Sequence, residues 1–275
     1  MHYEKSTWRL IEHAPAKGAW NMAVDEAILE SVYEGVSPPT LRLYAWQPAC
    51  LSLGHAQPHS EANKEVLNQQ GWDLVRRPTG GRAILHVDEL TYAVIAHQSE
   101  PRVRGGVLES YLNLSEALME ALRMLGLTPQ ANENRSNHKP NKPNPVCFEV
   151  PSNYEITVNG KKLIGSAQAR RKEGLLQHGA LPLHGDLTRI ITALRFKDTA
   201  AQADAKARLL AHATTVEHEL GQPLSWETAS QAFQSAFQRA LNLDLQPGQL
   251  TEIEAERAQQ LVVEKYTHPS WNERI

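Results

Sequence analysis

The sequence contains few cysteines, little excess charge and no long apolar run. Only Cys50 and Cys147 occur among 275 residues, too few for a disulfide framework. The formal net charge of −3 argues against a general binder of nucleic acid or membrane surfaces. No apolar stretch is long enough to span a bilayer, and the N-terminus lacks the apolar core of a secretion signal. These absences predict a cytoplasmic protein with reduced thiols, no membrane contact and no nucleic-acid partner.

Several familiar catalytic motifs are missing as well. The chain has no G-x-S-x-G elbow, no P-loop and no G-x-G-x-x-G fingerprint. His86 and His178 lack partners at the spacing of zinc ligands, so the sequence predicts that no metal is bound. Either histidine can instead shape a pocket or carry a proton.

What the chain does contain is a glycine loop between apolar runs, within residues 71–97. The pattern predicts a strand, the loop, a strand, a turn and a further strand. Gly80 and Gly81 lack a Cβ atom, so their backbone N–H groups can approach a ligand closely. Neighbouring arginines favour an anionic or strongly polar ligand, whereas the alternative is a hairpin with a solvated basic turn. These arginines are Arg76, Arg77 and Arg82.

Hydrophobic periodicity predicts two clear helices in the first half of the chain. Residues 20–32 are expected to form a helix whose apolar side chains share one face. Asp25, Glu26 and Glu30 are expected on the opposite face. Residues 107–125 form the longest expected helix, with leucines recurring at helical spacing.

Strand and turn signals predict a mixed α/β body before a helical tail. Asn159-Gly160 is a two-residue hairpin signal between strand-like runs. Beyond residue 186 the chain is mostly helical, and Thr251 is suited to cap a helix. A break near residues 195–199 divides this mixed α/β body, residues 1–198, from a helical C-terminal extension packed on it, residues 199–275.

Cys147 is the first candidate for chemistry. It follows a polar loop, residues 132–145, and a thiol at the edge of a loop can be exposed and reactive. The alternative, which the sequence context alone favours, is a small buried side chain. Cys50 lies inside the apolar run ACLSL and is expected in the core.

Lys162 is the second candidate. Lys161 and Lys162 are adjacent on an expected strand, so they point to opposite faces and one of them faces inward. An inward lysine near a thiol would lower the pKa of that thiol, or would hold an acyl oxygen as charge develops on it. The alternative, favoured by spacing alone, is two solvated lysines at a turn.

Taken together, these segments resemble one family. The stretches are NMAVDEAIL, RRPTGGRAILHVDELTY, the cysteine in VCFEVPSNYE, GKKLIGSAQ and LQHGALPL. They are similar to the lipoate/biotin protein ligase and transferase superfamily and, within it, to octanoyltransferases of the LipM type. The resemblance covers nearly the whole chain. It implies an α/β (α+β) fold with a mixed central sheet flanked by helices, as in the catalytic module of biotin protein ligase.

The resemblance also implies a reaction. An octanoyl group would pass from octanoyl-acyl carrier protein to the Cys147 thiolate, and then to a lysine of a lipoyl domain, typically that of the glycine cleavage H protein. No cofactor is implied, because a thioester is activated enough to form an amide without a nucleotide. A monomer is expected, since helices and loops supply enough cover for the sheet.

Site residues follow from the resemblance position by position. Cys147 matches the nucleophile, and Lys162 matches the lysine that faces the acyl carbonyl. The positions that match the substrate-binding walls are Arg77, Thr79, Gly80, Gly81, His86, Gly165, Ser166, Ala167, His178 and Gly179. A local basic surface would steer acidic partner proteins, although an ordinary solvated face is equally compatible. Its members would be Arg76, Arg170, Arg171 and Lys172.

Three other functions remain open at this point. The first is an ATP-dependent lipoate–protein ligase, for which Cys147 would be incidental. The second is a cysteine enzyme that moves octanoate between lipoyl domains. The third is a non-catalytic member of the superfamily that binds an acylated carrier or a cofactor and has a regulatory role. The joint presence of Cys147 and Lys162 argues against this third function.

Overall fold

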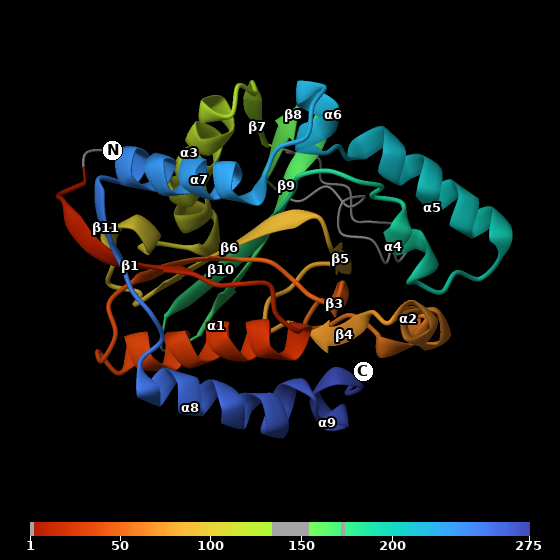
Figure 1. Ribbon diagram of the computed structural model, residues 1–275, viewed down its shortest axis with the longest axis horizontal. Helices are drawn as coiled ribbons and strands as arrows, with labels where there is room; N and C mark the ends of the chain where they lie inside the picture. The colour runs from red at the N-terminus through yellow and green to blue at the C-terminus, as the bar shows by residue number, and fades with distance from the viewer. Residues whose placement is uncertain (1–2, 134–153, 172–173) are drawn as a thin grey trace.

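The computed structural model describes residues 3–133, 154–171 and 174–275. The described strands form two sheets (Figure 1). The larger has eight strands in the order β11-β1-β2-β6-β10-β9-β8-β7, and the smaller has the order β4-β3-β5. In the larger sheet β1 is parallel to β2 and β11, and the other neighbours are antiparallel. The predicted mixed sheet is therefore confirmed.

The strands of the larger sheet are β1 (Ser6–Glu12), β2 (Thr40–Tyr44), β6 (Glu89–Ala96), β7 (Pro129–Glu133), β8 (Tyr154–Val158), β9 (Lys161–Arg170), β10 (Leu175–Pro182) and β11 (Leu243–Pro247). Those of the smaller sheet are β3 (Cys50–Leu53), β4 (Asp73–Arg76) and β5 (Ile84–His86). The helices are α1 (Gly18–Tyr33), α2 (Lys64–Gln70), α3 (Val107–Met124), α4 (Arg189–Thr192), α5 (Thr199–His212), α6 (Val216–Leu220), α7 (Trp226–Leu241), α8 (Glu252–Leu261) and α9 (Pro269–Asn272). A π-helical turn, Val262–Tyr266, joins α8 to α9.

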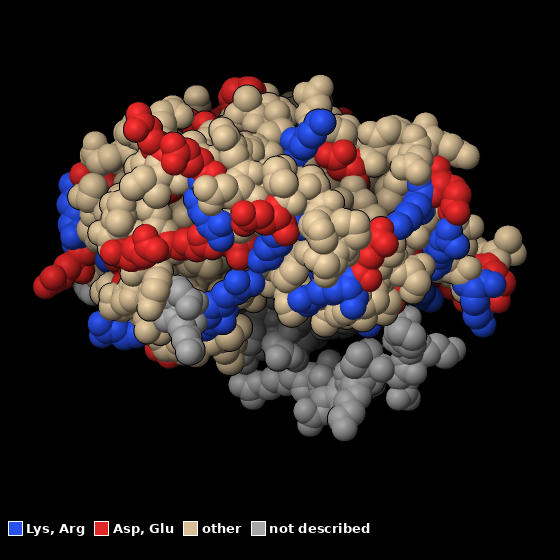
Figure 2. All heavy atoms as spheres, turned by 90° about the horizontal axis from the view of Figure 1, so that it is seen from below, with Lys and Arg blue, Asp and Glu red and all other residues tan. Residues whose placement is uncertain are grey.

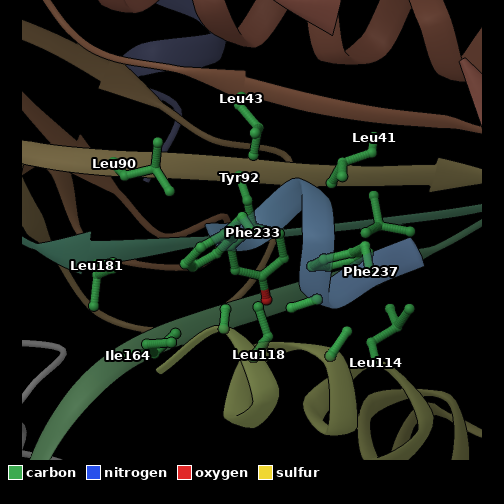
Figure 3. Packing of buried hydrophobic residues seen from close by; sticks show 14 of the residues in the cluster. Leu41, Leu43, Leu90, Tyr92, Leu114, Leu118, Ile164, Leu181, Phe233 and Phe237 are labelled. Atoms are coloured by element: carbon green, nitrogen blue, oxygen red, sulfur yellow. The ribbon is translucent and has the colours of Figure 1, made fainter. Parts of the chain in front are cut away.

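Helices cover both faces of the larger sheet (Figure 1). On one face α3 and α7 pack on the strands through an apolar core (Figure 3). There the rings of Tyr92, Phe233 and Phe237 meet, with centroids 6.0 to 6.5 Å apart. Burial of each such ring contributes about 1.5–3 kcal/mol, so this face stabilises the sheet on which the site is built.

The opposite face of the sheet is covered by α1, which is itself covered by α8. The predicted helix at residues 20–32 is confirmed, but the predicted solvent face is wrong for two of its residues. Asp25 is 0% exposed and Glu26 is 6% exposed, because α1 lies between the sheet and α8. Asp25 bonds with Arg42 on the sheet side, and Glu26 pairs with Lys265 beyond the end of α8.

Local signals in the sequence were reliable. The expected helix at residues 107–125 is α3, and Asn159 and Gly160 take the positive φ values of 50° and 77° that a tight hairpin requires. Thr251 caps α8 and forms a capping box with Glu254. The expected polar loop at residues 132–145 begins inside β7, and its part from residue 134 onward lies outside the described residues.

The C-terminal part is mostly helical, as predicted, but it also contributes a strand. β11 pairs in parallel with β1, and α7 belongs to the core beside α3. The division into residues 1–198 and 199–275 stays a prediction. Within the described part of the chain, no helix is both long and apolar enough to cross a membrane.

Candidate active site

The glycine loop, residues 77–82, connects β4 to β5 in the smaller sheet. The Arg77 guanidinium closes this loop on itself, donating to the carbonyl oxygens of Gly80 at 2.7 Å and Arg82 at 2.8 Å. It also donates to Ser52 on β3, at 3.0 Å to the hydroxyl. Gly81 has a φ of +89°, a conformation that favours glycine. The loop is thus held in one shape by its own arginine.

The expectation that all three arginines attract an anionic ligand is wrong for Arg76. Arg76 is 0% exposed, and its guanidinium donates to the backbone carbonyls of Gly54, Gln57 and Asn272. Arg82 is partly exposed and lies 3.7 Å from Glu61. An arginine whose N–H groups donate to backbone carbonyls stabilises the backbone around it, and it has few N–H donors left for an anion.

A narrow pocket lies between the two sheets, on the side of α1. Seven predicted substrate-binding residues line it: Arg77, His86, Gly165, Ser166, Ala167, His178 and Gly179. The sequence interpretation missed the other lining residues, which are Met22, Tyr44, Trp46, Ser52, Ile84, Thr91 and Ala180. The pocket has a volume of about 370 Å³, which includes open solvent at its mouth. Most of this volume is too narrow for water, because the centre of a water molecule fits in only about 20 Å³ of it. The pocket is therefore a slot suited to a thin ligand.

The larger sheet contributes four neighbouring strands to the walls of the slot. These strands are β2, β6, β10 and β9, which are neighbours in that order. Three strand spacings amount to about 14 Å. The β9 wall of the slot belongs to the strand that also bears Lys162.

Three predicted residues, Thr79, Gly80 and Gly81, are not among the residues that line the pocket. Thr79 is 0% exposed, and its hydroxyl is 2.7 Å from His178 Nε2. Gly80 and Gly81 form the loop that Arg77 closes. A Cβ atom built on Gly54 would lie 1.9 Å from the carbonyl oxygen of Gly81, so the two backbones touch. The loop therefore shapes the pocket through Thr79 and Arg77.

Asp25 is the centre of a buried polar network under the slot. Its carboxylate accepts from Arg42 at 2.6 Å and from the Tyr44 hydroxyl at 3.0 Å, and it lies 3.4 Å from His178 Nδ1. Burial raises the pKa of Asp25, but the charge of Arg42 and the bonds from His178 and Arg42 outweigh it, so the pKa lies below its usual value. Asp25 is ionised at neutral pH.

The state of His178 follows from that charge. Burial lowers the pKa of His178 in spite of Asp25, so its ring is neutral at pH 7. An ionised carboxylate only accepts hydrogen bonds, so Nδ1 carries the ring proton and Nε2 accepts from the Thr79 hydroxyl. His178 thus turns a fixed, uncharged ring toward the slot.

His86 is held in the same manner at the other wall. Its Nε2 lies 2.7 Å from the Ser52 hydroxyl and its Nδ1 lies 2.7 Å from Glu89. The ring stacks on Trp46 at 4.0 Å, and Trp46 donates to the Thr91 hydroxyl at 2.7 Å. Ser52 is 0% exposed and also accepts a hydrogen bond from Arg77. The series Ser52, His86 and Glu89 therefore fixes the imidazole ring of His86 in the pocket wall.

The polar groups that line the pocket therefore already have hydrogen-bond partners within the protein. The hydroxyl of Tyr44, the indole of Trp46 and the rings of both histidines all have partners in the networks above. What remains for a ligand is mostly carbon, from aromatic faces, Met22 and Ile84. A slot of this kind favours an apolar chain.

Lys162 lies on β9, three residues before Gly165. Its side chain is 5% exposed, and its ammonium group is 3.0 Å from Glu155. The prediction that one of the two adjacent lysines faces inward is confirmed, and the alternative of two solvated lysines is wrong. Cys147, the expected partner of Lys162, lies outside the described residues.

Cys50 is in the core, as predicted. It is 0% exposed, and burial raises the pKa of its thiol well above the usual value. A Cβ atom on Gly18 would lie 2.3 Å from Cys50 Sγ, so this part of the interior is closely packed. We expect Cys50 to be unreactive, because thiolates and not thiols are nucleophilic.

Mass spectrometry after brief N-ethylmaleimide treatment at pH 7 tests this expectation. The variant Cys147→Ala, which keeps Cys50 as its sole thiol, should gain no adduct when native and one adduct in denaturant. An adduct on the native variant would show that Cys50 is accessible, and would contradict its assignment to the core.

His13 borders the same network, and its Nδ1 accepts from Arg42 Nε at 2.9 Å. Burial and the charge of Arg42 lower the pKa of His13 to about 4 from its ordinary 6.5. Between these values the unfolded chain binds a proton that the folded chain does not. The free energy of unfolding should therefore fall as pH drops from 6.5 toward 4.

Urea denaturation at pH 7 and pH 4.5 measures this fall. The variant His13→Gln, which can still accept from Arg42, should lose less stability over the same interval than the wild type. Equal losses would mean that His13 does not contribute to the acid sensitivity.

The expectation of a basic surface that steers acidic partner proteins stays a prediction, except for Arg76. Arg76 is buried, so its inclusion was wrong. Arg170 is half-buried and donates to the carbonyl oxygen of Val103, whereas Arg171 is exposed and pairs with Glu26 at 3.2 Å. Lys172 lies outside the described residues. On the face that carries α8 and α9, basic and acidic side chains are interspersed (Figure 2).

No group of three His, Cys, Asp or Glu suited to a metal occurs within residues 3–133, 154–171 and 174–275.

Known proteins resemble this chain over nearly its whole length. The model of the lipoyl protein ligase A/B catalytic domain matches residues 17–238. An octanoyltransferase LipM from Kyrpidia tusciae is 40% identical over 272 residues, covering 98% of this chain and 99% of the relative. An octanoyltransferase LipM from Symbiobacterium thermophilum is 40% identical over 276 residues, with coverage of 98% and 99%.

Solved structures agree with the fold. A bipartite lipoate protein ligase from Thermoplasma acidophilum, studied with its E2 lipoyl domain, has a TM-score of 0.79 and 25% identity over 98% of this chain and 97% of that chain. A lipoate-protein ligase A bound with ATP has the same TM-score and identity, with coverage of 97% and 98%. The chain therefore belongs to the lipoyl protein ligase A/B catalytic-domain family and, within it, to the octanoyltransferases of the LipM type, which are acyltransferases of lipoate biosynthesis.

Proposed function

We propose that the protein takes an octanoyl group from octanoyl-acyl carrier protein onto Cys147 and passes it to a lysine of a lipoyl domain. The observation that carries this proposal is the apolar slot, whose polar wall groups are already paired, next to the strand that bears the inward-facing Lys162. An uncharged chain of eight carbons suits such a slot, and an ammonium group on β9, the strand that also supplies Gly165 and Ala167 to the wall, suits a reacting carbonyl.

Two nucleophilic steps account for the transfer. In the first, the Cys147 thiolate attacks the thioester carbonyl, and the carrier leaves as its thiolate. In the second, a neutral lysine amine attacks the new thioester, the C–N bond forms and the C–S bond breaks. Cys147 leaves as a thiolate, and the proton of the amine passes to solvent. Thioester exchange is nearly balanced and the amide is more stable, so no nucleotide or other cofactor is required.

Lys162 has two roles in this scheme. Its positive charge lowers the pKa of a nearby thiol and so favours the Cys147 thiolate. The same charge stabilises the oxyanion that forms in each step. The ion pair with Glu155 at 3.0 Å supports these roles, because it holds the ammonium group in place with little solvent around it.

The remaining site residues bind the acyl chain. We assign the walls to Arg77, His86, Gly165, Ser166, Ala167, His178 and Gly179, and the support behind them to Thr79, Gly80 and Gly81. The carbonyl end lies toward β9 and the methyl end toward β2. Substituting Ala167 by leucine would fill the slot, and Gly179 has no room for a Cβ atom because Tyr92 lies 2.6 Å from where it would stand.

The acceptor in this proposal is a lipoyl domain, and specifically that of the glycine cleavage H protein. The Thermoplasma ligase of the same fold, which was studied with an E2 lipoyl domain, supports an acceptor of this kind. We further propose that the protein acts as a monomer in the cytoplasm, where the acyl carrier protein of fatty-acid synthesis is found.

Intact-mass measurement tests the proposal. Mixed with octanoyl-acyl carrier protein and no ATP, the wild type should gain the mass of one octanoyl group, and Cys147→Ala should gain none. Added H protein should remove the group from the enzyme and acquire it. Acylation that needs ATP would identify an ATP-dependent ligase, and acylation that survives in Cys147→Ala would exclude the cysteine intermediate.

A further inference from the structure

We propose that the C-terminal segment, Tyr266–Arg274, positions the glycine loop from outside the pocket and thereby sets how tightly the acyl donor binds. The effect on the donor rests on the proposed function; the effect on the loop does not. None of the sequence patterns indicated this role, because the segment lies almost two hundred residues after the loop and contributes no side chain to the slot.

The segment is bonded to Arg76, which immediately precedes the loop. Asn272 Oδ1 accepts the backbone N–H of Arg76 at 2.8 Å, and Trp271 Nε1 donates to the Arg76 carbonyl at 2.8 Å. The Arg76 guanidinium donates in turn to the carbonyls of Trp271 at 3.0 Å and Asn272 at 2.9 Å. Backbone and side chain of Arg76 are thus both fixed by the same two residues.

Arg76 and Arg274 extend the connection to the turn formed by residues 54–57. Arg76 Nη1 donates to the carbonyls of Gly54 at 2.9 Å and Gln57 at 2.6 Å. Arg274 donates to the carbonyl of His55 at 2.7 Å and stacks on Trp271, 4.5 Å from its ring centroid. The turn is therefore bonded directly to Arg274 of the C-terminal segment, and also to Arg76, which that segment holds.

The turn formed by residues 54–57 also contacts the glycine loop. His55 donates its backbone N–H to the carbonyl of Thr79 at 2.9 Å, and the backbone of Gly54 touches Gly81. Thr79 then bonds with His178, which lines the slot. A continuous series of hydrogen bonds thus runs from Asn272 to the pocket wall.

Loss of this support should raise the population of misplaced loop conformations. Arg77 would still close the loop on itself, so the loop would keep its shape but not its place against His178. An enzyme whose binding-competent conformation is only partly populated binds its ligand more weakly by that fraction. Once the donor is bound the loop is in place, so the rate at saturation should change little.

The test compares Asn272→Ala with Glu273→Ala. Asn272→Ala removes the side-chain bonds to the Arg76 N–H and to the Tyr266 carbonyl. It should raise the octanoyl-acyl carrier protein concentration for half-maximal acylation at least about tenfold, with the maximal rate within about twofold. Asn272→Asp keeps the acceptor for Arg76 and should restore most of the affinity. Glu273→Ala removes an exposed pair with Lys64 and a longer contact with His59, 3.9 Å away, and should behave as wild type.

Amide hydrogen exchange gives a readout that needs no activity. Peptides covering residues 77–82 should exchange about tenfold faster in Asn272→Ala, while Glu273→Ala leaves them unchanged. Arg274→Ala, at an exposed position, serves where Asn272→Ala fails to fold, and should show a smaller change in the same direction. Unchanged exchange in folded Asn272→Ala or Arg274→Ala would overturn the proposal.

These experiments distinguish a failure of the proposed function from a failure of the role proposed for the C-terminal segment. Wild-type protein that is never acylated would refute the proposed function and leave the exchange result to decide the role of the segment. Faster exchange together with unaltered half-saturation would refute the effect on the donor. A fall in maximal rate with unchanged half-saturation would also refute it, since it would indicate damage to the chemistry.

Discussion

Replacing Lys162 by methionine is expected to slow acylation of Cys147 by about 10²–10³-fold, the loss associated with one group that stabilises an oxyanion. Methionine keeps much of the length and apolar volume of the side chain but carries no charge. Lys161→Met is the matched control, because the adjacent lysine lies on the other face of β9, and its rate should stay within about twofold of the wild type.

The pH dependence of cysteine alkylation separates the two roles proposed for Lys162. If its charge favours the thiolate, the pH at which Cys147 reacts half-maximally should rise in Lys162→Met and stay unchanged in Lys161→Met. If Lys162→Met is acylated at the wild-type rate, Lys162 has no role in the reaction. Slow acylation without a shift in the alkylation profile would assign it to the oxyanion alone.

Substitution of Asp25 by alanine is expected to lower the free energy of unfolding by about 3–5 kcal/mol. Arg42 is 0% exposed and would be left as an uncompensated charge in the interior. Tyr44 and His178 would lose their acceptor at the same time, so the floor of the slot should be disordered as well. Urea denaturation at pH 7 measures the loss.

Glu30→Ala provides the comparison for Asp25→Ala. Glu30 is also on α1 and also pairs with an arginine, Arg257 at 2.6 Å, but both side chains are about one-third exposed. Its loss should cost less than about 1 kcal/mol. Similar losses in the two variants would mean that burial of the Asp25–Arg42 pair has no special consequence for stability.

The glycine loop illustrates how far local sequence reasoning extends. Its glycines and its flanking strands were predicted from short-range patterns, whereas spacing alone favoured two solvated lysines on β9 over the inward-facing Lys162 that the structure shows. The function of Arg76 was not predicted either, because its partners Gly54, Gln57 and Asn272 are distant in the chain and are backbone carbonyl groups. No side-chain pattern records which carbonyl an arginine will meet.

Asp25 shows a similar limit on a helix. Periodicity correctly predicted α1 but assigned Asp25 to a solvent face, since a charged residue there is usually exposed. The pairing with Arg42 on β2 reverses that assignment, and it depends on α8 covering the outer side of α1. The recurrence of Asn21 and Asp25 one helical turn apart, both of which bond with Arg42, is the signal that was available in the sequence.

The sequence by itself determined local elements: the amphipathic α3, the tight hairpin before β9, the glycine loop, and the place of Cys50 in an apolar core strand. These depend on neighbours within a few residues, where steric and hydrogen-bonding preferences act directly. Only the tertiary structure decided that Trp46, Met22 and Ser52 share a slot with β9 and β10, and that a C-terminal segment holds the loop. Those contacts join residues far apart in the chain, and burial between two sheets brings them together.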